Sequence, residues 1–188
     1  MTAPIELHVH EFDDATVRAT LRAVQRVIRR RQSTLPVYVC SYGGDIARLC
    51  GILDALSACP VPVATIALGG AYSCGAVLLA SGTRGHRWIG PNASAMVHEA
   101  MTLAPITGST SVVTVEARDL AAASERMLAT LDRGCGKRPG YWRRALKRRG
   151  NTDWYLTAAQ AVKLGLADHI GAPVFVSERR TVMKGASA

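Results

Sequence analysis

The hydrophobic pattern of the N-terminal part of the chain repeats one unit, a short apolar run followed by a helical stripe. Residues 5–10 alternate between apolar and polar side chains, which predicts a half-buried strand. Asp13 or Asp14 can cap the helix that follows. Four apolar residues at helical spacing predict its buried face: Val17, Leu21, Val24 and Ile28.

The unit then occurs twice more. Residues 37–40 predict a second strand and "SYGGD" a glycine turn, and the stripe of the next helix is Ile46, Leu49, Leu53 and Leu56. In the third copy, residues 61–68 form an apolar run, Gly69 and Gly70 break it, and residues 73–80 predict a helix. Strand followed by helix three times favours right-handed crossovers. We therefore expect an α/β fold with a mostly parallel sheet and flanking helices.

The C-terminal half predicts fewer and less regular elements. "RWIG" and "SAMVHE" indicate two short strands, residues 114–131 a long helix, and residues 157–164 a short helix ended by Gly165. A chain of 188 residues suits one domain. We place that domain at residues 1–172 and a C-terminal tail at residues 173–188.

Composition narrows the class of protein. Apolar residues make up 48% of the chain and charged residues 20%, as in an ordinary globular protein, and 5% aromatic residues argue against a stacking surface for single-stranded nucleic acid. Five cysteines form no CxxC pair, and the N-terminus lacks the features of a signal peptide, so we expect a reducing cytoplasm. Residues 55–83 carry no charge, but Pro60, Pro62 and Gly69-Gly70 divide them into shorter pieces. This stretch therefore predicts buried elements and no membrane span.

The net charge of +9 is concentrated in one place. Residues 137–149 ("KRPGYWRRALKRR") hold seven basic residues and no acid. Such a run could attract phosphates or acidic protein. A solvated basic face, or one that meets acids on a neighbouring subunit, is the more common outcome, and nucleic-acid binding is the minority interpretation.

We expect the functional site at the glycine turns, because ligands of open α/β sheets bind outside the carboxyl ends of the strands. Ser73 follows the second turn and would stand at a helix N-terminus, where a nucleophile or a simple helix cap would both fit. His98 closes the apolar run "SAMV" and could act as its base, or be an ordinary edge histidine. Asp153 could orient that imidazole or cap the helix that follows.

Taken together, these residues resemble the Clp protease proteolytic subunit, a serine peptidase of the ClpP/crotonase fold with repeated ββα units. The resemblance rests on "VYVCSYGGD", "ALGGAYSCGAVLLASG", "RGHRWIGPNASAMVHEA" and "DWYLTAAQAVKLGLAD", and it covers residues 5–170. The spacings from Gly44 to Ser73 and from Ser73 to His98 match the family without a gap.

The resemblance implies a serine endopeptidase with Ser73 as nucleophile, His98 as general base and then acid, and Asp153 as the residue that orients His98. The backbone N–H groups of Gly44 and Cys74 would form the oxyanion hole. It implies no cofactor and no metal, a peptide or unfolded protein as substrate, and a homo-oligomeric ring.

The chain also departs from the family pattern. It begins near the family's first core strand, so a partnership with a Clp-type ATPase is in doubt. Asn151 and Thr152 replace residues that pair between stacked rings in the family, which puts a double ring in doubt. Tyr42 replaces the proline of the family's SPGG turn, and Tyr72 replaces a small residue, so Tyr72 is expected to narrow or line the entrance.

Other functions stay open at this point. A crotonase-like acyl-CoA enzyme would use the same pair of N–H groups but lacks the Ser, His and Asp set. A non-catalytic scaffold subunit would keep the fold without turnover. Nucleic-acid binding would rest on residues 137–149 alone, and a metal site at His8 and His10 has no evident third ligand.

Overall fold

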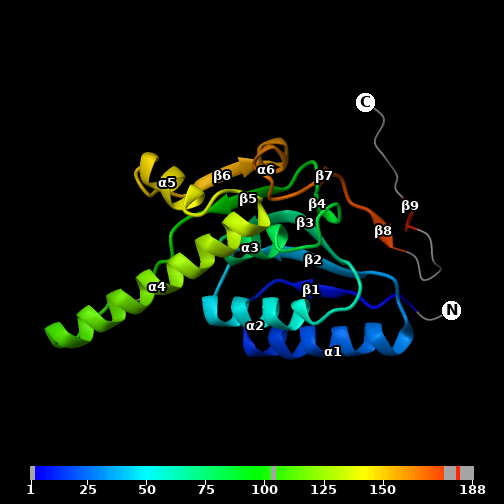
Figure 1. Ribbon diagram of the computed structural model, residues 1–188, viewed down its shortest axis with the longest axis horizontal. Coiled ribbons are helices and arrows are strands. Elements are labelled where there is room, and N and C mark those ends of the chain that lie inside the picture. Colours follow the sequence, from blue (N-terminus) through cyan, green and yellow to red (C-terminus); the bar gives the residue numbers. More distant parts are fainter. Residues whose placement is uncertain (1–2, 103–104, 176–180, 183–188) are drawn as a thin grey trace.

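The computed structural model describes residues 3–102, 105–175 and 181–182 and is shown in Figure 1. Its helices are α1 (Asp14–Arg30), α2 (Ile46–Ser57), α3 (Cys74–Ala80), α4 (Thr110–Gly134), α5 (Tyr141–Arg148) and α6 (Ala158–Leu164). Its strands are β1 (Leu7–Val9), β2 (Leu35–Ser41), β3 (Val63–Tyr72), β4 (Arg87–Ile89), β5 (Ser94–Val97), β6 (Trp154–Thr157), β7 (His169–Ile170), β8 (Val174–Phe175) and β9 (Thr181–Val182). The fold is α/β with a mostly parallel sheet, as expected from the sequence.

The main sheet has the strand order β1-β2-β3-β4-β7, with β5 and β6 continuing from the far end of β3. All its pairings are parallel except that of β5 with β6. Because the parallel strands run in one direction, their carboxyl ends meet at one edge. β6 runs the other way, so its N-terminal end lies at that same edge.

Gly69 and Gly70 do not break the third strand, as the sequence pattern had predicted. β3 continues through both glycines to Tyr72, and Gly69 has φ +74°. Residues 67 and 71 of β3 pair with residues 39 and 41 of β2, so β3 carries two extra residues at the glycine pair. At this bulge β3 changes partner from β4 to β5.

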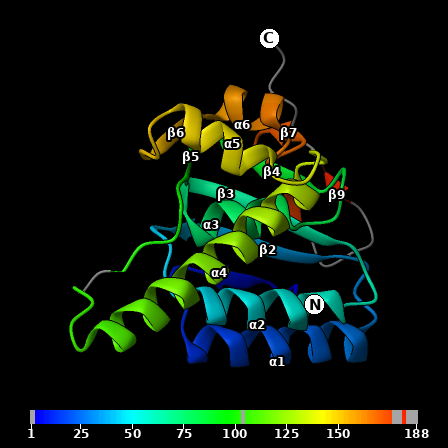
Figure 2. The same cartoon turned by 60° about the vertical axis from the view of Figure 1, so that its left-hand side comes forward.

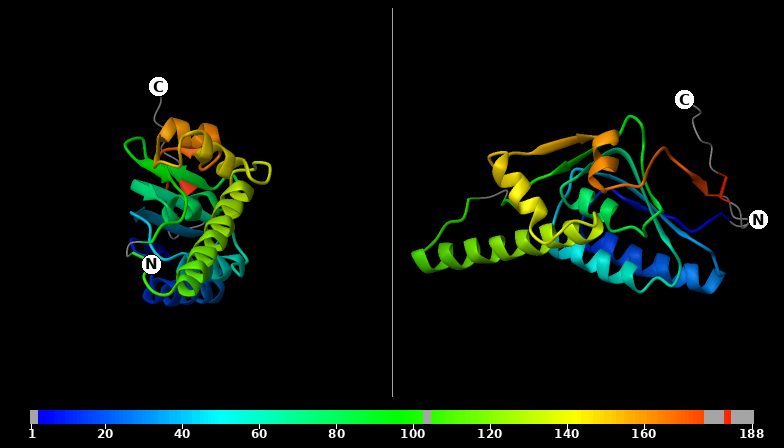
Figure 3. Two further views of the ribbon diagram at one scale, coloured as in Figure 1. Left: turned by 90° about the vertical axis from the view of Figure 1, so that its left-hand side faces the viewer. Right: turned by 45° about the horizontal axis from the view of Figure 1, so that its top comes forward.

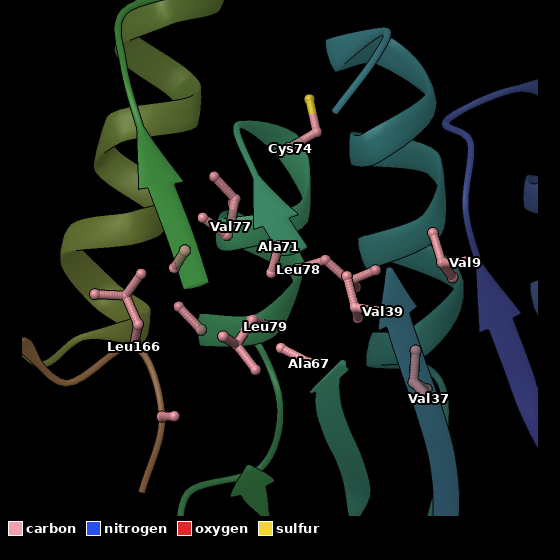
Figure 4. Packing of buried hydrophobic residues seen from close by; sticks show 14 of the residues in the cluster. Val9, Val37, Val39, Ala67, Ala71, Cys74, Val77, Leu78, Leu79 and Leu166 are labelled. Atoms are coloured by element: carbon pink, nitrogen blue, oxygen red, sulfur yellow. The ribbon is translucent and has the colours of Figure 1, made fainter. Parts of the chain in front are cut away.

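One face of the sheet carries the core. All six helices contribute buried residues to the same cluster, and α1 and α2 lie side by side against the sheet in Figure 2. Figure 4 shows Leu78 and Leu79 of α3 close to Val39 of β2 and Ala67 of β3, and all four side chains are fully buried. α3 is thereby fixed beneath the strands that position its N-terminus.

The buried face of the first helix is only partly the predicted one, because Val17 and Val24 pack against the core but the other two predicted residues do not. Leu21 and Ile28 are exposed, whereas Thr20, Ala23 and Val27 are buried with Val24. Small residues allow the helix to approach the sheet closely, and the Thr20 hydroxyl is satisfied by the carbonyl of Thr16. The predicted cap is present, because the Asp13 side chain accepts from the N–H of Thr16.

The sequence pattern predicted none of five elements in the C-terminal half, namely α5, β6, β7, β8 and β9, and α4 is longer than predicted. α4 extends beyond the expected residues 114–131 at both ends and projects from the body in Figure 3. α5 forms within the basic run, and β6 forms directly after Asp153. α6 and its left-handed cap at Gly165 follow the prediction. Of the predicted tail at 173–188, residues 176–180 and 183–188 lie outside the described residues, and the domain boundary stays a prediction.

Candidate active site

Four segments of the predicted site meet at one edge of the sheet. The Gly43-Gly44 turn follows β2, Ser73 follows β3 and His98 follows β5. Asp153 precedes β6, and the antiparallel pair Val97–Trp154 sets residue 98 opposite residue 153. Ser73, His98 and Asp153 are therefore brought together by strand pairing.

Ser73 occupies the sharp turn between β3 and α3. Its backbone has φ 53° and ψ −117°, a region that residues other than glycine rarely adopt. The Ser73 N–H donates to the carbonyl of Met96 at 2.8 Å, and the Ser73 carbonyl accepts from the N–H groups of Ala76 and Val77 in the first turn of α3. Ser73 is the N-cap residue of α3, but its side chain makes no capping hydrogen bond. The Ser73 hydroxyl therefore does not serve as a helix cap.

The Ser73 hydroxyl instead meets a histidine. Ser73 Oγ lies 2.8 Å from His98 Nε2, and His98 Nδ1 lies 3.3 Å from Asp153 Oδ1. The imidazole is largely buried, with 13% of its side chain exposed, whereas Asp153 is half exposed. With Nδ1–H directed at the carboxylate, Nε2 is left as an acceptor for the hydroxyl proton. This arrangement can deprotonate an alcohol.

Gly43 approaches Ser73 more closely than a residue with a side chain could, and Gly44 packs closely against Phe12. A Cβ atom on Gly43 would lie 2.7 Å from Ser73 Cβ, and its φ is +110°. Gly44, with φ +154°, packs against Phe12, where an added Cβ would lie 3.0 Å from Phe12 Cβ. The glycine turn thus lies directly against Ser73.

Cys74 connects this turn to α3. Its thiol donates to the Gly44 carbonyl at 3.2 Å. Within the described residues, no hydrogen bond uses the N–H of Gly44 or of Cys74. Burial raises the pKa of the Cys74 thiol to about 11, outweighing the hydrogen bonds to Gly44 and Ser73. Cys74 is fully buried, so the thiol is protonated and shielded at neutral pH.

Tyrosines gather beside the nucleophile. Tyr72 makes edge contacts with Tyr42 and Tyr155, at 5.7 and 5.6 Å between ring centroids, and its hydroxyl lies 2.8 Å from that of Ser94. Tyr42 is 88% exposed. The sequence singled out Tyr42 and Tyr72 as departures from the family, but it gave no sign of Tyr155, because that contact depends on the pairing of β5 with β6.

Features of two other kinds are absent from the described residues. No group of three or more metal-ligating side chains could hold a metal ion there. In the same part of the chain, no helix is long and apolar enough to cross a bilayer. A cavity of about 680 Å³ lies between α2 and α4, and its lining includes Cys50, Cys59 and Arg126. Ser73, His98 and Asp153 do not line this cavity.

Comparison with known proteins adds an independent line of evidence. The family model described as Clp protease matches residues 9–173. Similar proteins include the ATP-dependent Clp protease proteolytic subunit 3 of Nocardia farcinica, which is 33% identical over 163 residues, 85% of this chain and 71% of the relative. Subunit 2 of Mycobacterium tuberculosis is 32% identical over 163 residues, 85% of this chain and 73% of the relative. Subunit 1 of Mycobacterium leprae is 32% identical over 136 residues, 72% of this chain and 65% of the relative.

Proposed function

Because this chain belongs to the Clp protease family, we propose that it is a serine endopeptidase whose catalytic residues are Ser73, His98 and Asp153. The family and the names of its relatives support a proteolytic function. The observation that carries the finer proposal is the chain of contacts from Ser73 Oγ to His98 Nε2 and from His98 Nδ1 to Asp153.

In the proposed mechanism, Ser73 Oγ attacks the carbonyl carbon of the scissile bond while His98 Nε2 takes the hydroxyl proton. Asp153 holds the ring in the tautomer that leaves Nε2 free and stabilises the imidazolium. The tetrahedral intermediate collapses when His98 gives the proton to the leaving amine. Water, activated by the same histidine, then hydrolyses the acyl-enzyme.

The backbone N–H groups of Gly44 and Cys74 are proposed as the oxyanion hole. Both are without a hydrogen bond among the described residues. Cys74 directly follows Ser73, and its thiol donates to the Gly44 carbonyl, so the two residues are neighbours. Loss of one such donor typically lowers turnover about 100-fold to 1000-fold.

We further propose that residues 1–172 act as a single peptidase domain in a cytoplasmic homo-oligomer, with a peptide or unfolded protein as substrate. The free state of all five cysteines supports a reducing compartment. The family relationship supports the oligomer.

The decisive experiment is labelling with a fluorophosphonate, read by intact mass and peptide mapping. Wild-type protein should be labelled on Ser73 and should cleave a fluorogenic peptide, and Ser73→Ala should do neither. Cys74→Ala is the matched control at the adjacent residue and should keep most activity, because Cys74 contributes a backbone N–H. If Ser73→Ala stayed active while Cys74→Ala lost activity, the nucleophile would be wrongly assigned. Cleavage of an acyl-CoA thioester without peptide cleavage would favour the crotonase-like alternative.

A further inference from the structure

Within the basic run, α5 is an amphipathic helix whose four cations lie on one side. In α5, Trp142, Ala145 and Leu146 are buried. The α5 basic face consists of four exposed residues: Arg143, Arg144, Lys147 and Arg148. Arg138 and Arg149, just outside the helix, are exposed as well.

Buried contacts with α4 and β6 anchor α5. The carboxylate of Asp132, which is only 3% exposed, accepts from the N–H of Gly140 at 2.6 Å and from the N–H of Trp142 at 3.0 Å. Trp142 is fully buried beside Trp154. These contacts fix the position of the helix without using the charges of its outer face.

Like charges within the α5 basic face oppose helix stability, although Lys147 and Arg148 lie in the last turn, where the helix dipole favours cations. Arg143 with Lys147, and Arg144 with Arg148, are like charges four residues apart, which repel each other. The first turn of α5 holds no acid, although the helix dipole favours one there. Of the four cations, Arg143 has an ion-pair partner, Glu125 of α4. Asp132 serves backbone donors and does not pair with the outer face.

A short segment of chain joins α5 to the candidate active site. The guanidinium of Arg149 lies 4.5 Å from the ring centroid of Trp154, which directly follows Asp153. Three residues lie between Arg149 and Asp153 in the sequence, so their Cα atoms are about 14 Å apart at most. α5 extends the cations about 12 Å further. An extended peptide rises about 3.3 Å per residue, so its residues roughly four to eight positions from the scissile bond can reach these cations.

We infer that the α5 basic face is a substrate-binding surface for acidic segments of a peptide, next to the bond that is cut. The inference rests on the proposed peptidase function and names its preferred substrate class. Carboxylates of the substrate would relieve the repulsion within α5 and raise the local concentration of peptide at the site. An acidic peptide is favoured over nucleic acid because the short connection from α5 to Asp153 brings the face close to a candidate peptide-cleaving site.

The test uses two fluorogenic peptides with the same cleavable core, one flanked by glutamates and the other by glutamines four to eight residues away. We expect kcat/KM for the glutamate peptide to exceed that for the glutamine peptide about tenfold at low salt, as for a few exposed charge contacts. Because the Debye length falls from about 30 Å at 0.01 M to 10 Å at 0.1 M salt, added salt should reduce this ratio toward one.

The matched variants are triple substitutions on two exposed helical faces. Arg144→Gln with Lys147→Gln and Arg148→Gln should abolish the preference for the glutamate peptide. Arg22→Gln with Arg26→Gln and Arg29→Gln removes the same charge from α1, on another side of the molecule (Figure 1), and should keep the preference. Arg144→Lys with Arg148→Lys, which keeps the charge, should keep the preference, a result that a merely structural role of arginine would not predict.

Binding to the Ser73→Ala variant separates this inference from the proposed function. The anisotropy of the labelled glutamate peptide should report salt-sensitive binding that the α5 triple substitution removes, even if no peptide were cleaved. Equal binding or equal kcat/KM for the two peptides would overturn the inference. It would also fail if the α1 triple substitution had the same effect, if an oligonucleotide bound α5 more tightly than the glutamate peptide, or if the α5 triple substitution altered the oligomeric mass.

Discussion

At the scale of single residues, the site depends on the backbone of Ser73 and on the absence of a side chain at Gly43. A non-glycine residue with φ 53° and ψ −117° carries local strain, and here hydrogen bonds to Met96, Ala76 and Val77 hold it. The strained turn directs Oγ at His98. The glycine turn after β2 contacts the same serine from the other side.

Gly43→Ala should therefore impair catalysis more than it impairs folding. The new Cβ would lie 2.7 Å from Ser73 Cβ, so either the serine or the turn must shift. A displacement of about 1 Å at a catalytic group can cost about 100-fold in rate. Peptide hydrolysis and the rate of fluorophosphonate labelling measure this loss.

Gly85→Ala is the control for this substitution. Gly85 also has positive φ, +81°, but an added Cβ meets nothing within 4 Å. It should show the backbone strain alone, with a small drop in melting temperature and near-normal labelling. Equal losses of labelling in the two variants would contradict the steric argument.

At the scale of secondary-structure elements, Arg87 of β4 forms hydrogen bonds with the C-terminal ends of three helices. The side chain is 4% exposed, and its Nη1 donates to the carbonyls of Ala80, Gly134 and Gly165, at the ends of α3, α4 and α6. Nε and Nη2 donate to the Asp168 carboxylate. One buried cation thereby satisfies carbonyls that the helices leave free at their C-terminal ends.

Arg87→Met should destabilise the fold by about 3–5 kcal/mol, as expected when one partner of a buried, hydrogen-bonded pair is removed. Urea unfolding followed by circular dichroism measures the change in the free energy of unfolding. Arg22→Met, on the exposed face of α1, is the control and should change it by less than about 0.5 kcal/mol. A similar effect of the two substitutions would show that the buried network contributes little.

At the scale of the whole molecule, the pairing of Arg87 with Asp168 makes the free energy of unfolding depend on pH. Partial burial opposes ionisation of Asp168, but hydrogen bonds and charge from Arg87, with the N–H groups of Gly85 and Arg87, outweigh it and hold the Asp168 pKa below its ordinary value of 3.8. The unfolded chain therefore binds the proton more readily than the folded chain. The stabilisation is fully present above the unfolded pKa and is lost as pH falls through the folded pKa.

Thermal unfolding between pH 2 and pH 6 tests this dependence. The melting temperature of the wild type should fall below about pH 4 in part because Asp168 becomes protonated. Asp168→Asn should be less stable at pH 6 and should lose less stability on acidification. Parallel pH profiles of the two proteins would contradict the role given to this carboxyl group.

The projecting part of α4 carries exposed apolar residues that we expect to contact another copy of the chain. Val112 and Val115 are exposed near its N-terminal end, which extends beyond the rest of the molecule in Figure 3. We expect native mass spectrometry at micromolar concentration to show a homo-oligomer. Val112→Glu with Val115→Glu should weaken it, because charge replaces apolar contact surface. The control, Leu21→Glu with Ile28→Glu on the exposed face of α1, should leave the mass unchanged. A wild-type monomer would contradict the proposal.

The sequence by itself determined what depends on neighbouring residues. The β-α repeats, the Asp13 cap, the turn at Gly43-Gly44 and the stop at Gly165 each follow from local periodicity or backbone preference. The site residues were also proposed from the sequence, because the glycine turns and "SAMVH" mark the ends of strands and because their spacing matches a family.

Only the tertiary structure decided what depends on partners distant in the chain. Gly69 and Gly70 form a bulge and do not end β3, because β5 continues the ladder beyond β4. Asp153 meets His98 because β6 pairs with β5 in the antiparallel direction, and no local pattern records that pairing. Arg143, Arg144, Lys147 and Arg148 lie on one face of α5 because Asp132 and the buried Trp142 anchor this helix, and these contacts exist only once α4 has folded beside it.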